Sequence, residues 1–402
     1  MRRLTLALLA AAAPAFGDGP ELELGAENLY YRTAETPLNY GNVLGLDPGE
    51  DLLRGSLSAK QSLGSARLVF RGYVERSLGG TGNATRVRAR QAYAQYGFGS
   101  GLQLRFGKQR IAWGSGFAWN PTNRLEPPRN PVNTGLEQEG AWAARMDVIP
   151  APWAGVVLVA AQGTTNVGDL PFPTREAERT SGAIRVRFLA RDTDLAFVYL
   201  GGKNQKTLVG VDAARDVFGR VSLHAEAAFH RGSELDPLRQ DGTFFRIAAG
   251  ALHAAGTTSI TLEYFFNGEG LEDAANDRYL ASLEASYAAS QDPRLPPAAR
   301  EAALGRYLGL AAVPFSGGMG LRRHYLQGAW TRAGIGGEWT LALRAALGLG
   351  DGGIALTPGI TWSPRSDTSF GLDGVVLLGP ADSEYRLAPL KGALQARLKV
   401  AF

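Results

Sequence analysis

The spacing of strand-like segments constrains the fold of this 402-residue chain more than any other feature. Runs of about ten residues alternate apolar with polar or small side chains, as in 102–106 and 394–402, and clusters of Gly, Pro, Asp, Asn and Ser separate them. These separators alternate between long and short, so the long 33–51 is followed by the tight 63–65. A soluble sandwich gives no reason for strict alternation, whereas a membrane barrel has long loops at one end and short turns at the other.

The sequence therefore predicts an all-β fold: a transmembrane antiparallel β-barrel of about 18 strands, with 16 strands as the alternative. An even count places both chain ends on the periplasmic side, with the short turns. We expect a single barrel domain over 18–402, with notable extracellular loops at 114–140 and 267–318. Helical spacing of apolar residues within 271–310 predicts that the longest loop forms small helices over the barrel mouth.

The first 17 residues have the pattern of a secretory signal peptide. Arg2 and Arg3 precede an apolar run over 4–13, and small residues over 13–17 offer a cleavage site. The alternative is a short buried N-terminal helix; the apolar run is too short to span a bilayer, which needs about 20 residues. Without this segment the chain is nearly neutral and indicates no nucleic-acid partner. The absence of cysteine means that an exported product is stable without disulfides.

The C-terminal residue, Phe402, ends a run of apolar residues at period two. This strand resembles the terminal strand of Gram-negative outer-membrane barrels, which the barrel assembly machinery recognises. The alternative is a soluble edge strand that ends in Phe. Aromatic residues beside the short turns and beside the long loops also form the two belts expected at the surfaces of a membrane. These features predict a bacterial outer-membrane location and contact with outer-membrane lipid.

If apolar residues face lipid, the opposite face of each strand lines the lumen, and here it is basic on one wall. Consecutive strands lie about 5 Å apart, so these guanidinium groups form a ladder that suits anions. The alternative is that the arginines pair internally with Glu75, Asp147 or Glu137. The predicted wall comprises Arg67, Arg71, Arg86, Arg88, Arg90, Arg105, Arg145, Arg185 and Arg187.

A second charged cluster is expected to be structural. Arg397 and Lys399, with Gln395, face the same way on the last strand as Glu21 and Glu23 on the first. Barrel closure makes these two strands antiparallel neighbours, so opposite charges would help to set the closure register.

The third long connection is the predicted constriction loop. It is rich in rigid and turn residues, and its candidate site residues are Trp119, Asn120, Arg124, Glu126 and Arg129. The alternative is an ordinary surface loop. Together with 107–114, this segment resembles a stretch found in large porin-like Gram-negative barrels, including alginate-exporter and capsule-assembly types. The resemblance implies an inward-folded loop and a channel class, but no particular substrate.

Enzyme signals are weak, and no cofactor or metal motif is present in the sequence. Ser222, His224 and Glu226 share one strand face, but residues two apart on a strand lie about 7 Å apart, too far for a nucleophile to contact its base. We therefore expect no catalytic residue and a passive channel for small hydrophilic, anionic solutes. The alternatives are an exporter or surface-anchoring barrel for an acidic polysaccharide, and a plugged barrel with a structural role.

Overall fold

The computed structural model describes residues 21–46, 49–78, 85–126, 140–164, 178–235, 238, 242–316 and 319–402. Residues 1–17, where the signal peptide is predicted, lie outside this range. The first nine strands are β1 (Glu21–Thr33), β2 (Gly49–Leu63), β3 (Ala66–Ser77), β4 (Thr85–Phe98), β5 (Leu102–Gln109), β6 (Ala141–Ala151), β7 (Ala154–Thr164), β8 (Glu178–Ala190) and β9 (Thr193–Lys203). The others are β10 (Gln205–Val217), β11 (Val221–Arg231), β12 (Thr243–Ala255), β13 (Thr258–Asn267), β14 (His324–Ile335), β15 (Trp339–Gly348), β16 (Ile354–Arg365), β17 (Thr368–Leu378) and β18 (Leu390–Ala401).

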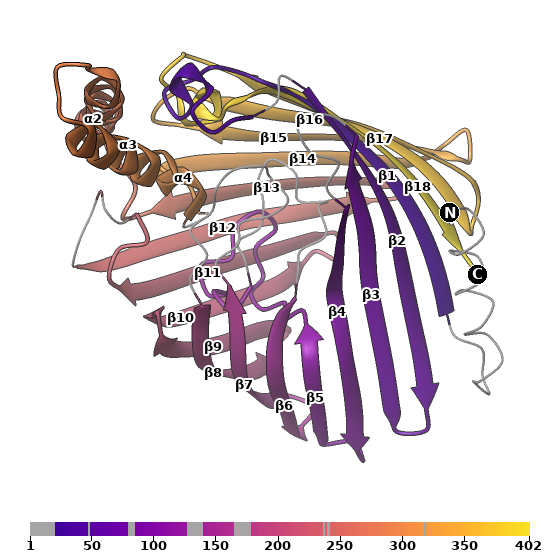
Figure 1. Ribbon diagram of the computed structural model, residues 1–402. Coiled ribbons are helices and arrows are strands. Elements are labelled where there is room, and N and C mark those ends of the chain that lie inside the picture. The colour runs from indigo at the N-terminus through magenta and orange to yellow at the C-terminus, as the bar shows by residue number, and fades with distance from the viewer. Residues whose placement is uncertain are drawn as a thin grey trace.

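These 18 strands form one closed antiparallel barrel (Figure 1). Each strand pairs with its neighbours in the chain, and β1 pairs with β18 to close the sheet. Glu23 lies opposite Ala401, so the start of the first strand and the end of the last meet at the same end of the barrel. The prediction of an 18-stranded all-β barrel is confirmed, because local alternation and turn residues specify each hairpin without long-range information.

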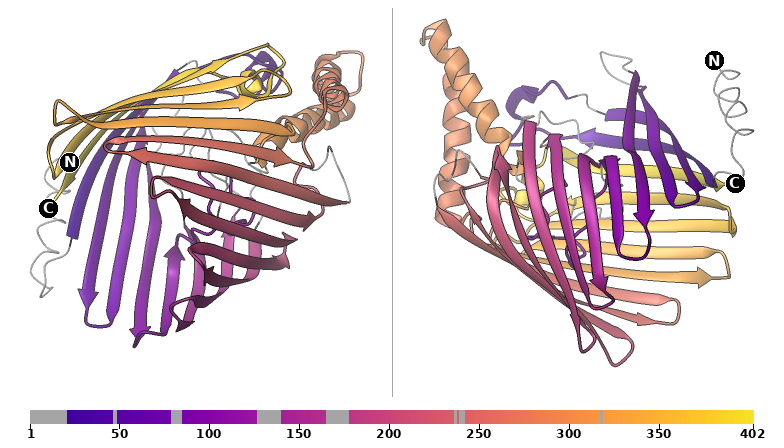
Figure 2. Two further views of the ribbon diagram at one scale, coloured as in Figure 1. Left: turned by 180° about the vertical axis from the view of Figure 1, so that it is seen from behind. Right: turned by 90° about the horizontal axis from the view of Figure 1, so that it is seen from below.

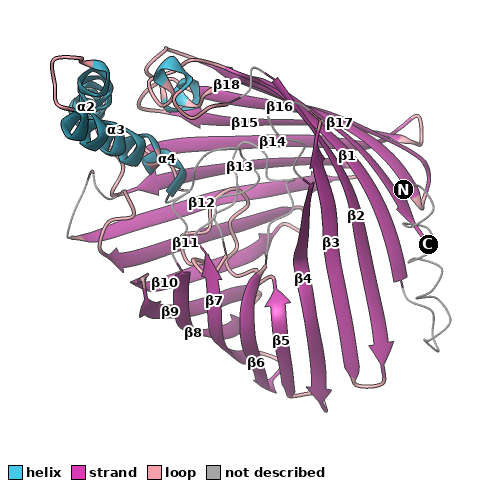
Figure 3. Ribbon diagram, in the orientation of Figure 1, coloured by secondary structure: helices cyan, strands magenta, loops and turns pink. Residues whose placement is uncertain are grey.

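The two ends of the barrel differ as the connections predict. Tight turns join the strands at one end, and the helices gather at the other (Figure 3). Between β13 and β14 lie α2 (Asp273–Gln291), α3 (Pro297–Ala311) and α4 (Val313–Ser316), and α5 (Glu384–Leu387) precedes β18. Since β14 begins at His324, the longest connection is longer than the predicted 267–318. Among the described residues, no helix is long and apolar enough to cross a bilayer.

An apolar cluster holds the helical connections together. Leu283 of α2 and Tyr307 of α3 are fully buried, and they pack with Leu38 before η2 (Tyr40–Asn42), Leu235 after β11 and Leu387 of α5. The hydroxyl of Tyr307 donates to the carbonyl of Pro37 at 3.1 Å and accepts from the backbone N–H of Tyr40 at 2.8 Å. Four connections from distant parts of the sequence thus form one cap at the long-loop end of the barrel (Figure 2).

The outward face of the sheet is apolar. Because side chains alternate along each strand, the exposed leucine and phenylalanine side chains share one face and the charged residues share the other. Exposed examples are Leu68, Phe70, Phe106, Phe197, Leu262, Leu343, Leu372 and Leu394. Of the aromatic residues expected at the long-loop belt, Tyr30, Tyr199 and Phe229 are exposed, but Tyr31, Tyr73 and Phe265 are buried. Tyr31, Tyr73 and Phe265 occupy the alternate positions of their strands, whose side chains point inward.

Candidate functional site

The loop that follows β5 lies inside the barrel (Figure 1). Ile111, Trp113 and Leu125 of this loop are buried in a cluster with small and aliphatic side chains from the inner faces of β6 to β11. The wall members of the cluster are Ala141, Ala143, Val159, Ala161, Ala183, Val198, Leu200, Leu208 and Ala228. These wall residues therefore form an apolar docking surface for Ile111, Trp113 and Leu125 of the loop.

The other part of the wall stays open to the lumen. Several inward side chains there are well exposed: the side chain of Arg86 on β4 is 61% exposed, Lys399 on β18 is 56% exposed and Glu23 on β1 is 41% exposed, whereas Arg54, Glu75 and Arg90 of the same wall are buried. Solute and water therefore have access to the side of the barrel formed by β18 and β1 to β5. This is the side that carries most of the predicted basic wall.

Three arginines of this wall lie in one register row across four strands. Arg67 pairs with Gln95, Gln95 with Arg105, and Arg105 with Arg145. The Arg105 guanidinium donates to Gln95 Oε1 at 2.9 Å and lies 4.9 Å from the centre of the Tyr93 ring. Within the described part of the chain, neither Arg67 nor Arg105 has a carboxylate within salt-bridge distance. Their positive charge is therefore directed at the lumen.

Other arginines of the predicted wall are paired with carboxylates. Arg145 binds Asp147 at 2.6 Å, Arg185 binds Asp212 at 3.0 Å, Arg187 binds Asp194 at 2.7 Å, and Arg86 lies 3.8 Å from Glu75. These contacts follow the alternative of internal pairing at those positions, so only part of the wall carries an unbalanced charge. The remaining members lie on the same inner face: Arg71 on β3, and Arg88 and Arg90 on β4.

Sequence reasoning missed a further part of this wall on β2. The guanidinium of Arg54 bridges Glu27 on β1, at 3.1 Å, and Glu75 on β3, at 2.5 Å. It also lies 4.4 Å from the centre of the Tyr73 ring, and Arg90 lies 4.6 Å from the same ring, within the range of cation–π attraction. The signal was the even spacing of Arg54, Ser56, Ser58 and Lys60, which places them on the same face of the strand.

The named residues of the inward loop are anchors rather than lumen charges. Trp119 is 2% exposed and stacks on Phe265 of β13, with ring centres 5.1 Å apart. Asn120, Arg124 and Glu126 are buried as well. Arg124 binds Glu234, and Glu126 accepts from the backbone N–H of Ile111, so both charges have partners within the protein, and their role in a constriction stays a prediction. Arg129 lies outside the described residues.

The described surface of the loop is small and has one charged group that is partly exposed. Glu126 accepts from the backbone N–H of Ile111 and lies 3.6 Å from Arg110, so it closes the base of the loop on itself. Among the described loop residues 110–126, those that remain at least partly exposed are Arg110, Ala112, Gly114, Ser115 and Phe117. An asymmetric lumen results, with several guanidinium groups on one side and, on the other, a hydroxyl, an aromatic ring, backbone and the guanidinium of Arg110.

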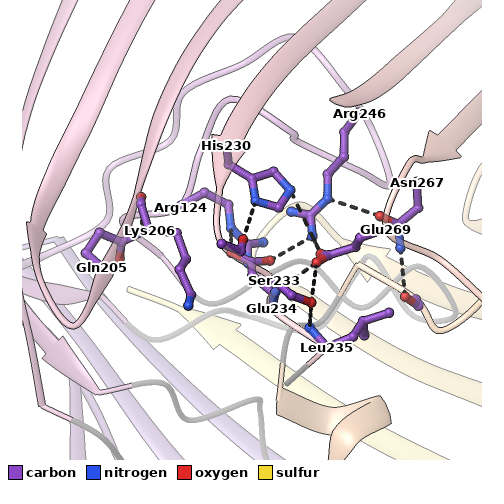
Figure 4. A network of polar contacts seen from close by, with 12 residues as sticks. Arg124, Gln205, Lys206, His230, Ser233, Glu234, Leu235, Arg246, Asn267 and Glu269 are labelled. Atoms are coloured by element: carbon purple, nitrogen blue, oxygen red, sulfur yellow. Dashed lines mark hydrogen bonds and ion pairs between the residues drawn. The ribbon is translucent and has the colours of Figure 1, made fainter. Parts of the chain in front are cut away.

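A buried ionic network ties the loop to the long-loop end of the barrel (Figure 4). Arg124 binds Glu234, which follows β11, and Arg246 of β12 binds both Glu234, at 2.9 Å, and Glu269. Ser233 donates to Glu269 at 3.0 Å. Burial alone would raise the pKa of Glu234, but the adjacent Arg124 and Arg246 guanidinium groups hold it well below its ordinary value of 4.5.

The charged cluster at the closure of the barrel is only partly as expected. Lys399 of β18 lies 2.8 Å from Glu23 of β1, across the seam. Arg397 binds Asp373 of the other neighbour, β17, because its strand position places the guanidinium beside that carboxylate. The backbone of Glu21 pairs with Lys60 of β2 instead of with β18, and its side chain is outside the described set.

The strand face considered for hydrolysis is engaged in structural contacts. His224 Nε2 lies 2.8 Å from Glu263 Oε2 on β13, and the Glu226 carboxylate accepts hydrogen bonds from the inward loop. Within the described residues no His, Cys, Asp or Glu side chains are grouped to hold a metal ion.

Comparison with known proteins gives matches in structure but none in sequence. No family model and no curated protein sequence matches the chain. Pseudomonas aeruginosa OccK2 (OpdF) shares the fold with a TM-score of 0.61 at 10% identity, over 96% of this chain and 99% of that one. Pseudomonas aeruginosa OprD gives 0.54 at 12% identity, over 98% and 97%. Acinetobacter baumannii OccAB1 gives 0.56 at 10% identity, over 97% and 98%.

The chain has the fold of an outer-membrane porin. The likeness spans nearly the whole length of each protein, so the 18-stranded porin barrel is complete in this chain from β1 to β18. At 10–12% identity it establishes the porin fold alone. The OccK2 and OprD structures are outer-membrane porins. The similarity to alginate-exporter and capsule-assembly barrels stays a prediction.

Proposed function

We propose that this protein is a passive channel of the bacterial outer membrane that admits small hydrophilic, anionic solutes. The porin fold and the apolar outward face support the location, because an 18-stranded barrel encloses an aqueous lumen wide enough for solutes. Export through the inner membrane is assigned to residues 1–17, and recognition by the assembly machinery to the strand that ends at Phe402.

The observation that carries the anionic preference is the row formed by Arg67, Gln95 and Arg105. Two guanidinium groups there lie on the inner face with no described carboxylate within salt-bridge distance, and the nearby Asp147 is bound by Arg145. In a confined, partly desolvated channel such groups raise the local concentration of anions and repel cations. The inward loop of residues 110–126 narrows the lumen from the opposite side, and thereby limits the size of the solute.

The test is ion selectivity of the refolded barrel, residues 18–402, in a planar bilayer under a salt gradient. We expect a steady conductance with an anion-directed reversal potential. Replacing both Arg67 and Arg105 by Glu should lower the anion-to-cation permeability ratio several-fold, because the unbalanced charge of the row changes sign. The control is Arg187→Gln/Asp194→Asn, which removes one paired charge of each sign, leaves the net charge of the wall unchanged and should have a smaller effect.

An unchanged reversal potential in the Arg67→Glu/Arg105→Glu variant would show that Arg67 and Arg105 do not set the ion selectivity. A folded wild-type barrel that conducts nothing would contradict the channel function itself. Uptake of small dianions and dications of equal size into liposomes containing the barrel gives an independent measure of the preference.

A further inference from the structure

Two buried glutamates lie on the barrel wall directly beneath the inward loop. Glu226 on β11 is 1% exposed and Glu263 on β13 is not exposed at all. The Glu263 carboxylate accepts three consecutive backbone N–H groups of the loop, from Phe117 at 2.5 Å, Ala118 at 3.0 Å and Trp119 at 2.8 Å. A carboxylate that receives successive main-chain amides in this way occupies an anion-binding concavity of the backbone.

Glu226 holds the same loop at two further points. One carboxylate oxygen accepts the backbone N–H of Gly116 at 2.6 Å, and the other accepts the backbone N–H and the hydroxyl of Thr122 at 3.3 and 2.8 Å. Buried carboxylates and buried backbone amides both cost free energy if they are left unpaired. The two glutamates and the loop therefore satisfy each other, and charge-assisted hydrogen bonds of this kind are the stronger ones.

The surrounding residues are shaped for this contact. Gly114 has a φ of +83°, and a Cβ there would lie 2.5 Å from Glu226 Oε1. On the wall, a Cβ at Gly210 of β10 would lie 2.9 Å from Thr122 Cγ2. Each glycine removes a side chain at a point where the loop and the wall approach closely. The fit is continuous from residue 114 to residue 122.

We infer that Glu226 and Glu263 are positioning residues that set the width of the channel by fixing residues 114–122 against β10 to β13. The inference rests on the proposed channel function. Neither glutamate faces the permeating solute, so the pair acts through the loop. We call Glu226 and Glu263, with their hydrogen bonds to residues 116–122, the clamp. When the clamp is intact, the loop has one position and the lumen has one cross-section. When it is broken the loop detaches and enters the open side of the lumen, in front of the arginine row.

Glutamine is the most informative substitution at both positions, because both oxygens of each glutamate accept hydrogen bonds and glutamine replaces one of these acceptors with a donor. A Gln side chain keeps its size but presents one NH2 group to a loop N–H, so at least one hydrogen bond becomes a donor–donor contact. We expect the Glu226→Gln/Glu263→Gln variant to lose the steady single-channel level of the wild type and to fluctuate between several levels. The control is Asp373→Asn on β17, a buried carboxylate that bonds strand residues and should retain one level.

A disulfide tests whether loop detachment is the cause. The chain contains no cysteine, so the pair Thr122→Cys and Gly210→Cys can lock the loop to β10 in the Gln variant. We expect fluctuations in the reduced protein and one steady level in the oxidised protein. Because both states are the same folded molecule, misfolding cannot account for the difference.

Two results would overturn the inference: a single wild-type level in the Gln variant, or fluctuations that persist in its oxidised form. Both leave the proposed function intact as long as the wild-type barrel conducts with anion preference. A folded wild-type barrel that shows no conductance would instead contradict the proposed channel function, and the role of the clamp could then not arise.

Discussion

Glu234 shows how a single side chain joins two parts of the structure that are far apart in sequence. Its carboxylate is almost fully buried between Arg124, from the inward loop, and Arg246, from β12. Because folding lowers its pKa below 4.5, the unfolded chain takes up the proton first as the pH falls. The contribution of Glu234 to the free energy of unfolding is therefore complete above about pH 4.5 and is lost progressively below it.

We expect Glu234→Gln to lower the free energy of unfolding at pH 7 by on the order of 3 kcal/mol, since it removes the negative charge that the buried guanidinium groups of Arg124 and Arg246 share. The variant should also lose part of the acid sensitivity of the wild type. Thermal unfolding followed by circular dichroism at pH 7 and pH 3 measures both effects. The control is Glu272→Gln, because Glu272 is 65% exposed in its pair with Arg323 and should change little.

Strand parity predicts the direction of the wall arginines, but it predicts neither their partners nor the anchors of the loop. Arg124 was expected to line the lumen, yet its partner Glu234 comes 110 residues later and no local pattern connects the two. Glu226 and Glu263 carried a usable signal. Each is a charged side chain at an inward position of a strand whose other inward positions are mostly small or uncharged, which indicates a specific buried partner.

At the scale of elements, the strands and the helices differ in how they can be predicted. Each strand is specified by alternation and flanking turn residues, which are local. The helices over 273–291 and 297–311 were predicted only as small helices, since what fixes their position is a cluster that also includes Leu38, Leu235 and Leu387. Those contacts join connections from four places in the chain.

The helical pair is expected to unfold locally without loss of the barrel. Leu283→Ala removes a fully buried side chain from its cluster and should cost about 2–5 kcal/mol locally. Limited trypsin digestion should then cleave faster after Arg278, Arg294 or Arg306, while the barrel keeps its β-sheet spectrum. Ala281→Ser, at an exposed position of the same helix, serves as the control. Equal cleavage rates in the two variants would show that Leu283 does not hold the helices.

At the scale of the whole molecule, the two faces of the sheet have opposite chemistry. Leu343 of β15 is outward and exposed, whereas the adjacent Ala342 is inward, opposite Gly359 of β16. If the outward face contacts hydrocarbon, Leu343→Arg should destabilise the barrel by about 2–4 kcal/mol in lipid bilayers. Ala342→Arg places the same charge in the lumen near Asp373 and should be tolerated.

Denaturant titration of the two variants refolded into vesicles measures this difference. Equal stabilities would contradict the assignment of the apolar face to lipid. The pattern of this face was predictable from the sequence, because an alternating barrel has only two faces. The arrangement of the lumen was not, since it depends on which half of the wall the inward loop covers.

The inward loop contacts the wall from β6 to β13, and Arg67 and Arg105 lie on β3 and β5. If the proposed function holds, size and charge are filtered by different segments of the chain. A substitution in the arginine row should change the charges that solutes meet without moving the loop, whereas a substitution of Glu226 or Glu263 should act first on the cross-section of the lumen. Such a channel can acquire a new substrate range in two independent steps, each of which leaves a working pore.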